Sequence, residues 1–88
     1  MRRRDGFVLQ QIGGESLLVP VGARVMDVNG LVTLNGTAAF LWRLLGEPRS
    51  SDELASAVSE AYDVDLSTAR QDVRAFLESI SAMGLLQA

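Results

Sequence analysis

The feature that most constrains this chain is the stretch from Gly30 to Leu45, which reads GLVTLNGTAAFLWRLL. It begins with a short apolar run of the kind that forms a strand, and Asn35 then interrupts the pattern. Asn35 is a good helix N-cap, because its side chain can accept a hydrogen bond from an amide two or three residues later. We therefore expect a strand over residues 31–34 that leads directly into a helix ending near Leu45.

This helix is apolar around most of its circumference. A helical wheel places Ala38, Leu41, Trp42 and Leu45 on one face, with Phe40 and Leu44 on the far side. Only Ala39 and Arg43 are left to face water, so we expect a central helix. Trp42 should pack in the core, and its indole N–H should reach a backbone carbonyl. Gly46 is expected to end the helix in the left-handed conformation.

The residues before this stretch have the pattern of a hairpin. Phe7–Ile12 and Ser16–Val21 are the two predicted strands, and glycines 13 and 14 supply the turn. Asn29–Gly30 is a further turn signal before the third strand. The run of arginines at positions 2–4 is interpreted as solvated, so residues 1–5 are expected to form a disordered terminus.

Two more helices are predicted after the central one. Ser50 and Glu53 are spaced as a capping box for a helix over Ser51–Tyr62, and Asp65 caps a third helix that reaches about Met83. Gly84 ends that helix, and residues 85–86 should fold back on the core or add a short strand. A three-stranded antiparallel sheet followed by three helices is an α+β fold, which we expect to form one domain over residues 1–88.

Composition removes several classes of function. The 88 residues include no cysteine and no histidine, so the usual thiolate and imidazole ligands and the commonest general base are missing. We therefore expect no enzyme activity, no metal and no cofactor. The formal charge of −3 argues against a nucleic-acid partner, because proteins that bind nucleic acid need cationic side chains to contact the phosphates. No segment has the 18 apolar residues that a membrane span needs, so we expect no membrane contact and a cytoplasmic location.

An ordered set of short motifs resembles the PqqD-like family. The segment from Leu34 to Trp42 is similar to the family pattern LNxTAAxIW, although Gly36 stands where an acidic residue is usual. The later motifs of the resemblance are Leu44-Leu45, Pro48-Arg49-Ser50, Glu53-Leu54, Tyr62-Asp63-Val64-Asp65, Asp72-Val73, Phe76-Leu77 and Gly84-Leu85-Leu86. Together they cover about residues 15 to 87 with consistent spacing.

The resemblance implies a winged-helix-like fold and a non-catalytic role as a peptide chaperone or recognition element. Such a protein binds the leader of a ribosomally made precursor peptide and presents it to a modifying enzyme, of the radical S-adenosylmethionine type in pyrroloquinoline quinone biosynthesis. The leader is implied to add as a strand to the third strand, in a groove walled by the third helix. The alternative from another class is a transcriptional regulator, because winged helices commonly bind DNA.

The candidate binding residues lie on these two elements. On the third strand they are Leu31, Val32, Thr33 and Leu34, which either pair on both sides or form an edge that is free for β-augmentation. The free edge also leaves open a homodimer formed by strand pairing or swapping. One flank of the third helix carries Arg70, Arg74 and Leu77, and the other flank carries Asp72, Ala75 and Ser79. The two arginines on the first flank are either a clamp for a leader carboxylate or part of a solvated face with helical ion pairs, and the sequence alone does not determine which flank faces the peptide.

Overall fold

A three-stranded antiparallel sheet and three helices that follow it make up the computed structural model, which describes residues 1–21 and 32–87. In chain order the elements are β1 (Arg2–Arg3), β2 (Phe7–Ile12), β3 (Glu15–Pro20), β4 (Val32–Leu34), α1 (Gly36–Leu44), α2 (Ser51–Tyr62), α3 (Leu66–Ala82) and β5 (Leu86–Gln87). The predicted α+β class is confirmed, and the arrangement is winged-helix-like. The predicted turn at Asn29–Gly30 and the strand residue Leu31 lie outside the described residues.

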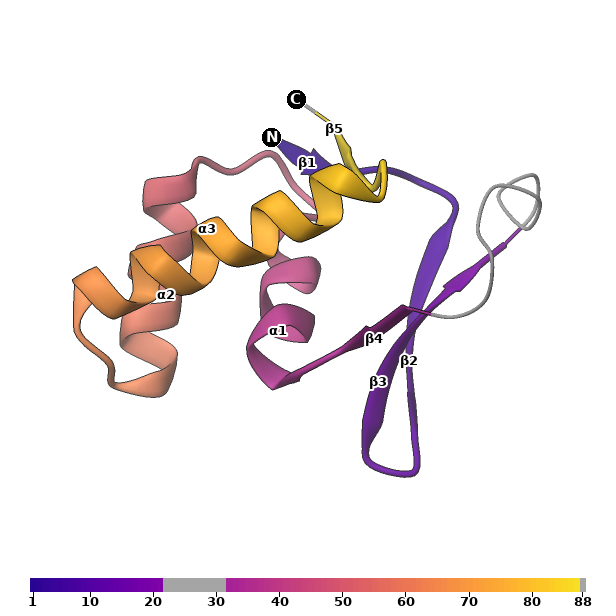
Figure 1. Cartoon of the computed structure of the whole chain (residues 1–88), viewed down its shortest axis with the longest axis horizontal. Coiled ribbons are helices and arrows are strands. Elements are labelled where there is room, and N and C mark those ends of the chain that lie inside the picture. Colours follow the sequence, from indigo (N-terminus) through magenta and orange to yellow (C-terminus); the bar gives the residue numbers. More distant parts are fainter. Residues whose placement is uncertain (22–31, 88) are drawn as a thin grey trace.

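The helices lie together on one side of the molecule, and the β2–β3 hairpin projects on the other (Figure 1). The strand order in the sheet is β2-β3-β4, and both pairings are antiparallel. β4 leads directly into α1, so the edge of the sheet and the start of α1 are held next to each other. None of the described helices has the length and apolar character that crossing a bilayer requires.

The three predicted helix caps are all present. The Asn35 side chain accepts a hydrogen bond from the Ala38 N–H at 2.8 Å, and the Asp65 side chain accepts one from the Thr68 N–H at 2.8 Å. Ser50 and Glu53 form the reciprocal bonds of a capping box, at 3.1 and 3.0 Å. These local bonds explain why the helix starts could be read from the sequence.

Helix α1 is central, as its composition predicts. Trp42, Leu41 and Leu45 are completely buried, and they belong to one hydrophobic core that also includes residues of β3, α2 and α3. The expectation that Ala39 faces water is wrong, because its side chain is only 2% exposed and is part of that core. The Trp42 indole N–H also differs from the prediction, since it is buried without a hydrogen-bond partner among the described residues.

The N-terminal segment, for which the sequence predicts disorder over residues 1–5, contains a short strand. Arg2–Arg3 form β1, which pairs antiparallel with β5 in a separate two-stranded sheet beside the end of α3 (Figure 1). Both predicted outcomes for the chain after α3 therefore occur: Leu85 is buried in the core, and Leu86–Gln87 add a short strand. The sequence pattern missed β1 because its partner is at the other end of the chain.

Arg3 fastens this segment to the C-terminal end of α1. Its backbone N–H donates to the Leu45 carbonyl at 2.9 Å, and its guanidinium donates to the Trp42 carbonyl at 3.0 Å while lying 5.5 Å from the centre of the Trp42 ring. Cations favour the C-terminal end of a helix and the face of an aromatic ring.

The predicted left-handed conformation of Gly46 is wrong, because the glycines with positive φ in the described chain are Gly6, Gly13, Gly14 and Gly84. A side chain there would instead crowd Arg3, since a Cβ atom would lie 3.2 Å from its Nη2.

We expect Arg3→Ala to lower the free energy of unfolding by about 1–3 kcal/mol, because it removes a charge-assisted hydrogen bond and a cation–π contact. Arg4→Ala is the matched control, since it removes the same charge from an exposed side chain and should change stability by less than about 0.5 kcal/mol. Urea melts of both variants measure the difference. Equal shifts would mean that only the overall charge of the terminus matters.

Candidate functional site

Strand β4 forms one edge of the three-stranded sheet. Within residues 1–21 and 32–87, it pairs with β3 and with no other strand. Of the two interpretations that the sequence left open, the structure therefore supports the edge. An edge strand presents unpaired backbone groups that another chain can use.

The hairpin turn determines which backbone groups face this edge. Gly13 and Gly14 have φ values of 59° and 84°, and they connect Ile12 directly to its partner Glu15. Positive φ at both positions is typical of a two-residue type I′ turn. In such a hairpin the residues that flank the turn exchange both hydrogen bonds, and hydrogen-bonded pairs then alternate along the ladder. The Val21 N–H donates to the Gly6 carbonyl at 2.9 Å, which fits the same alternation at the far end.

This alternation turns the backbone of Thr33 outward. The N–H and C=O of Leu17 form hydrogen bonds with Gln10 of β2. The backbone groups of its neighbours Ser16 and Leu18 therefore point the other way, toward β4. Ser16 pairs with Leu34 and Leu18 pairs with Val32, whereas Thr33 lies opposite Leu17. The N–H and the C=O of Thr33 therefore both point away from β3, toward the open edge.

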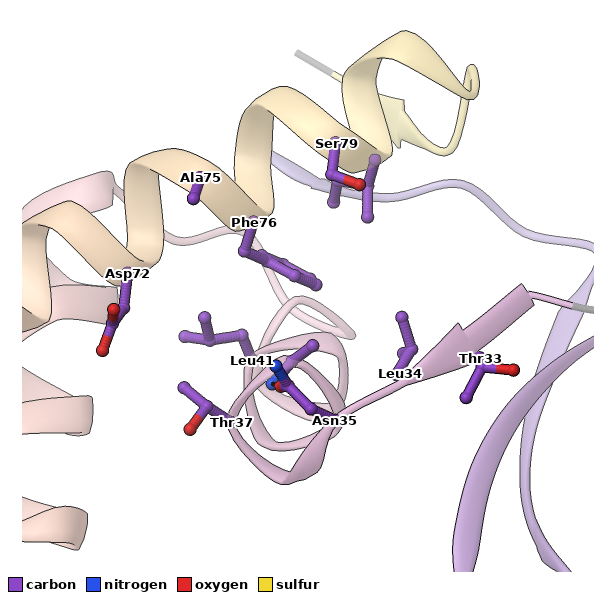
Figure 2. Close-up of a pocket in the computed structure, with 11 residues that line it drawn as sticks. Thr33, Leu34, Asn35, Thr37, Leu41, Asp72, Ala75, Phe76 and Ser79 are labelled. Carbon is purple, nitrogen blue, oxygen red and sulfur yellow. Dashed lines mark hydrogen bonds between the residues drawn. The ribbon is translucent and has the colours of Figure 1, made fainter.

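A groove of about 420 Å³ runs between this edge, the start of α1 and helix α3. Its lining residues are Thr33, Leu34, Asn35, Thr37, Ala38, Leu41, Asp72, Ala75, Phe76, Ser79 and Ile80. Figure 2 shows Leu34 directed from β4 toward Phe76 across the groove, with Ala75 and Ser79 on the same helix as Phe76 and with Thr33 next to Leu34 on β4. The structure thus brings together the edge strand and the long helix that the sequence singled out.

The groove combines an apolar floor with a polar rim. Leu41, Phe76 and Ile80 are buried, whereas Thr33, Asp72 and Ser79 are exposed. A ligand's apolar side chains gain free energy when they leave water for an apolar floor, and polar groups at the rim give orientation. The arrangement suits an extended peptide segment that alternates between the two kinds of surface.

The predicted residues of α3 lie on its other flank. Arg70, Arg74 and Leu77 line a second hollow, of about 250 Å³, together with Ser51, Asp52 and Val73. The structure therefore does not bring them to the groove beside β4, and the flank that faces β4 is the one with Asp72, Ala75 and Ser79. Val32 packs against the core and is not a lining residue, while Thr33 and Leu34 are at the groove as predicted.

Arg70 and Arg74 were predicted as binding residues but lie outside the groove. Phe76 lies in the predicted apolar arc of α3 and lines the groove, so the residues one turn away from it, Asp72 and Ser79, were the better guide. Asp65 has a structural role as the cap of α3: hydrogen bonds from the side chain and the backbone N–H of Thr68 lower the pKa of Asp65. Within the described residues, no acidic cluster is arranged to hold a metal ion.

A sheet with an open edge, packed beside three helices in a winged-helix-like arrangement, defines a class of small binding domains rather than one chemistry. Residues 20–86 match the family model described as coenzyme PQQ synthesis protein D (PqqD). The chain belongs to this family.

A solved structure is similar over the whole fold. It is the structure of TbiB1 in complex with the TbiA(beta) leader peptide, which has 26% sequence identity to this chain and a TM-score of 0.76. The similarity covers 100% of this chain and 96% of that chain. A comparison with curated proteins finds no significant match.

Proposed function

We propose that this protein is a non-catalytic recognition element that binds the leader of a ribosomally synthesised precursor peptide by β-strand addition. The observation that carries the proposal is the open backbone of Thr33 on the edge strand β4, next to the groove walled by α3. Family membership and the similarity to a protein solved with a leader peptide support the same role. β-augmentation derives affinity from main-chain hydrogen bonds and selectivity from side-chain pockets.

Because the edge strand is short, main-chain hydrogen bonds can supply only a small part of the free energy of leader binding. β4 has three residues, and one of them offers both backbone groups to an incoming strand. Two added hydrogen bonds contribute only about 1–3 kcal/mol in total. Burial of leader side chains against the apolar floor of the groove must therefore supply most of the affinity.

We also propose that the protein presents the bound leader to a modifying enzyme, of the radical S-adenosylmethionine type if the pathway resembles pyrroloquinoline quinone biosynthesis. Newly synthesised precursors are met in the cytoplasm, where we place the protein. A homodimer through the edge of β4 would occupy the same backbone groups, so dimer formation and leader binding should compete.

The direct test is an NMR titration of the protein with synthetic leaders from short reading frames that neighbour its gene. Amide shifts are expected at Thr33 and at Ala75 and Ser79 across the groove. Arg70→Ala combined with Arg74→Ala is the control, because both side chains line the other hollow. If this double variant weakened binding, the leader would run along the other flank of α3, as the arginines first suggested. Shifts confined to regions away from β4 and α3 would contradict strand addition altogether.

The winged-helix-like fold also makes a DNA-binding regulator the second candidate. We expect no sub-micromolar binding of duplex DNA at physiological salt, because the chain carries a net charge of −3 and can form few phosphate contacts. On α3, Arg70 and Arg74 are accompanied by Asp72 and Glu78, so the helix lacks a basic face. A gel-shift assay over a range of salt concentrations measures this. A tight, salt-sensitive shift would favour the regulator over the recognition element.

A further inference from the structure

We propose that Asp72 makes this groove selective for a leader segment with a lysine or arginine at the end that lies beside the start of α1. The inference rests on the proposed function, because it concerns the same groove and the same added strand.

Asp72 is the one charged side chain among the described residues that line the groove. In Figure 2 it extends from α3 at the end of the groove where Thr37 lies, away from Thr33 at the other end. The rest of the lining is apolar or uncharged. A ligand that fills the groove therefore meets one charge, and it meets that charge at one end.

Nothing in the described part of the chain neutralises this carboxylate. Asp72 forms no ion pair there, and the two described pairs join Arg2 to Asp5 and Arg49 to Glu47. Its neighbours one helical turn away are uncharged, namely Thr68, Ala69, Ala75 and Phe76. The nearby arginines, Arg70 and Arg74, are directed to the other flank of α3. A cation from a ligand is the partner that this position can accept.

The geometry of strand addition predicts which leader residue lies near the Asp72 carboxylate. An antiparallel leader, the more stable pairing, would place one residue opposite Thr33 and exchange both hydrogen bonds with it. The leader residues on either side of that one then share a face with Val32 and Leu34, which is the face of the sheet that packs on the core. Two apolar side chains, separated by one residue, would therefore enter the groove.

The next inward-facing position lies further along, past Leu34 and toward the start of α1. In an antiparallel leader, this position comes two residues before the first of the two apolar residues. Two residues of a strand span about 6–7 Å. Asp72 lies at that end of the groove, so we expect a long basic side chain, lysine or arginine, at this position of the leader to pair with it. The expected pattern is a basic residue, any residue, an apolar residue, any residue and a second apolar residue.

A structural role for Asp72 is the competing explanation. The first turn of α1 contains no acidic residue, and a nearby carboxylate would favour its positive end. That role would change the stability of the fold and leave the choice of ligand unaffected. The test must therefore read selectivity and stability separately.

The test is selection from a phage-displayed library of random peptides about twelve residues long, using the wild type, Asp72→Asn and Asp72→Arg. With the wild type, lysine and arginine should be enriched about fivefold at the position two residues before the apolar pair, the effect of a good exposed ion pair. Asp72→Asn should remove this bias, and Asp72→Arg should replace it with a preference for glutamate and aspartate. Urea melts of the three proteins measure the structural role independently.

Two further outcomes separate this inference from the proposed function. Selected peptides that lose binding with Thr33→Pro but show no charge bias would overturn the role of Asp72 and leave strand addition intact. A selection in which no peptide depends on Thr33 would overturn both. An unchanged bias in Asp72→Asn and Asp72→Arg, with lowered stability, would assign Asp72 to the structural role.

Discussion

Replacing Trp42 with alanine is expected to lower the free energy of unfolding by about 3–5 kcal/mol, the range for a buried large aromatic residue. Trp42 is completely buried on the central helix α1 and packs in the core with Leu41 and Leu45. A protein of this size has a total stability of only about 4–13 kcal/mol, so the variant will be partly or wholly unfolded. Circular dichroism and urea melts measure the effect.

Trp42→Phe is the informative control for this prediction. The indole N–H of Trp42 has no hydrogen-bond partner among the described residues, so its removal breaks no hydrogen bond. Phenylalanine keeps an aromatic face for the Arg3 guanidinium and most of the packing, and we expect a loss below about 2 kcal/mol. A loss under about 1 kcal/mol for Trp42→Ala would contradict the central position of α1.

Replacing Thr33 with proline is expected to reduce leader affinity at least about tenfold while the fold survives. Proline removes the backbone N–H that points toward the open edge, and its ring obstructs an incoming strand. Because β4 pairs only with β3 in the described chain, and Thr33 uses neither backbone group in that pairing, no existing hydrogen bond is lost. Peptide titration and urea melts of the same variant measure the two effects.

Two neighbouring substitutions make this test specific. Thr33→Val keeps the N–H and the β-branched shape, so leader binding should be close to that of the wild type. Val32→Pro removes an N–H that the alternation directs toward β3, and it should destabilise the domain by a few kcal/mol. If Thr33→Pro unfolded the protein and Val32→Pro did not, the alternation assigned to β4 would be reversed.

Much of the fold could be predicted because its determinants are local. The caps at Asn35, Ser50 and Asp65 each bond to an amide three residues later in the chain, so residue type and spacing are sufficient to identify them. The turn at Gly13–Gly14 and the αL residue Gly84 are determined in the same way, by conformations that glycine adopts readily. These signals predicted the three helices and the hairpin close to their observed bounds.

The candidate site was predictable only in part. The sequence identified an edge strand and a long amphipathic helix, and Thr33 and Leu34 do line the groove. It did not identify which flank of α3 faces β4, because the apolar arc is bordered by Arg70 and Arg74 on one side and by Asp72 and Ser79 on the other. The rotation of α3 against α1 and the sheet selects between these flanks, and that rotation depends on packing between residues far apart in the chain.

The same distinction separates what the sequence by itself determined from what the tertiary structure decided. Periodicity, caps and turns determined the three helices and the β2–β3 hairpin, since each of these signals depends on residues within about one turn of each other. Tertiary structure decided that Ala39 is buried, that β1 pairs with β5, and that Arg3 lies against Trp42 and Gly46. These contacts join distant segments, and their free energy is gained only after the intervening chain has been ordered.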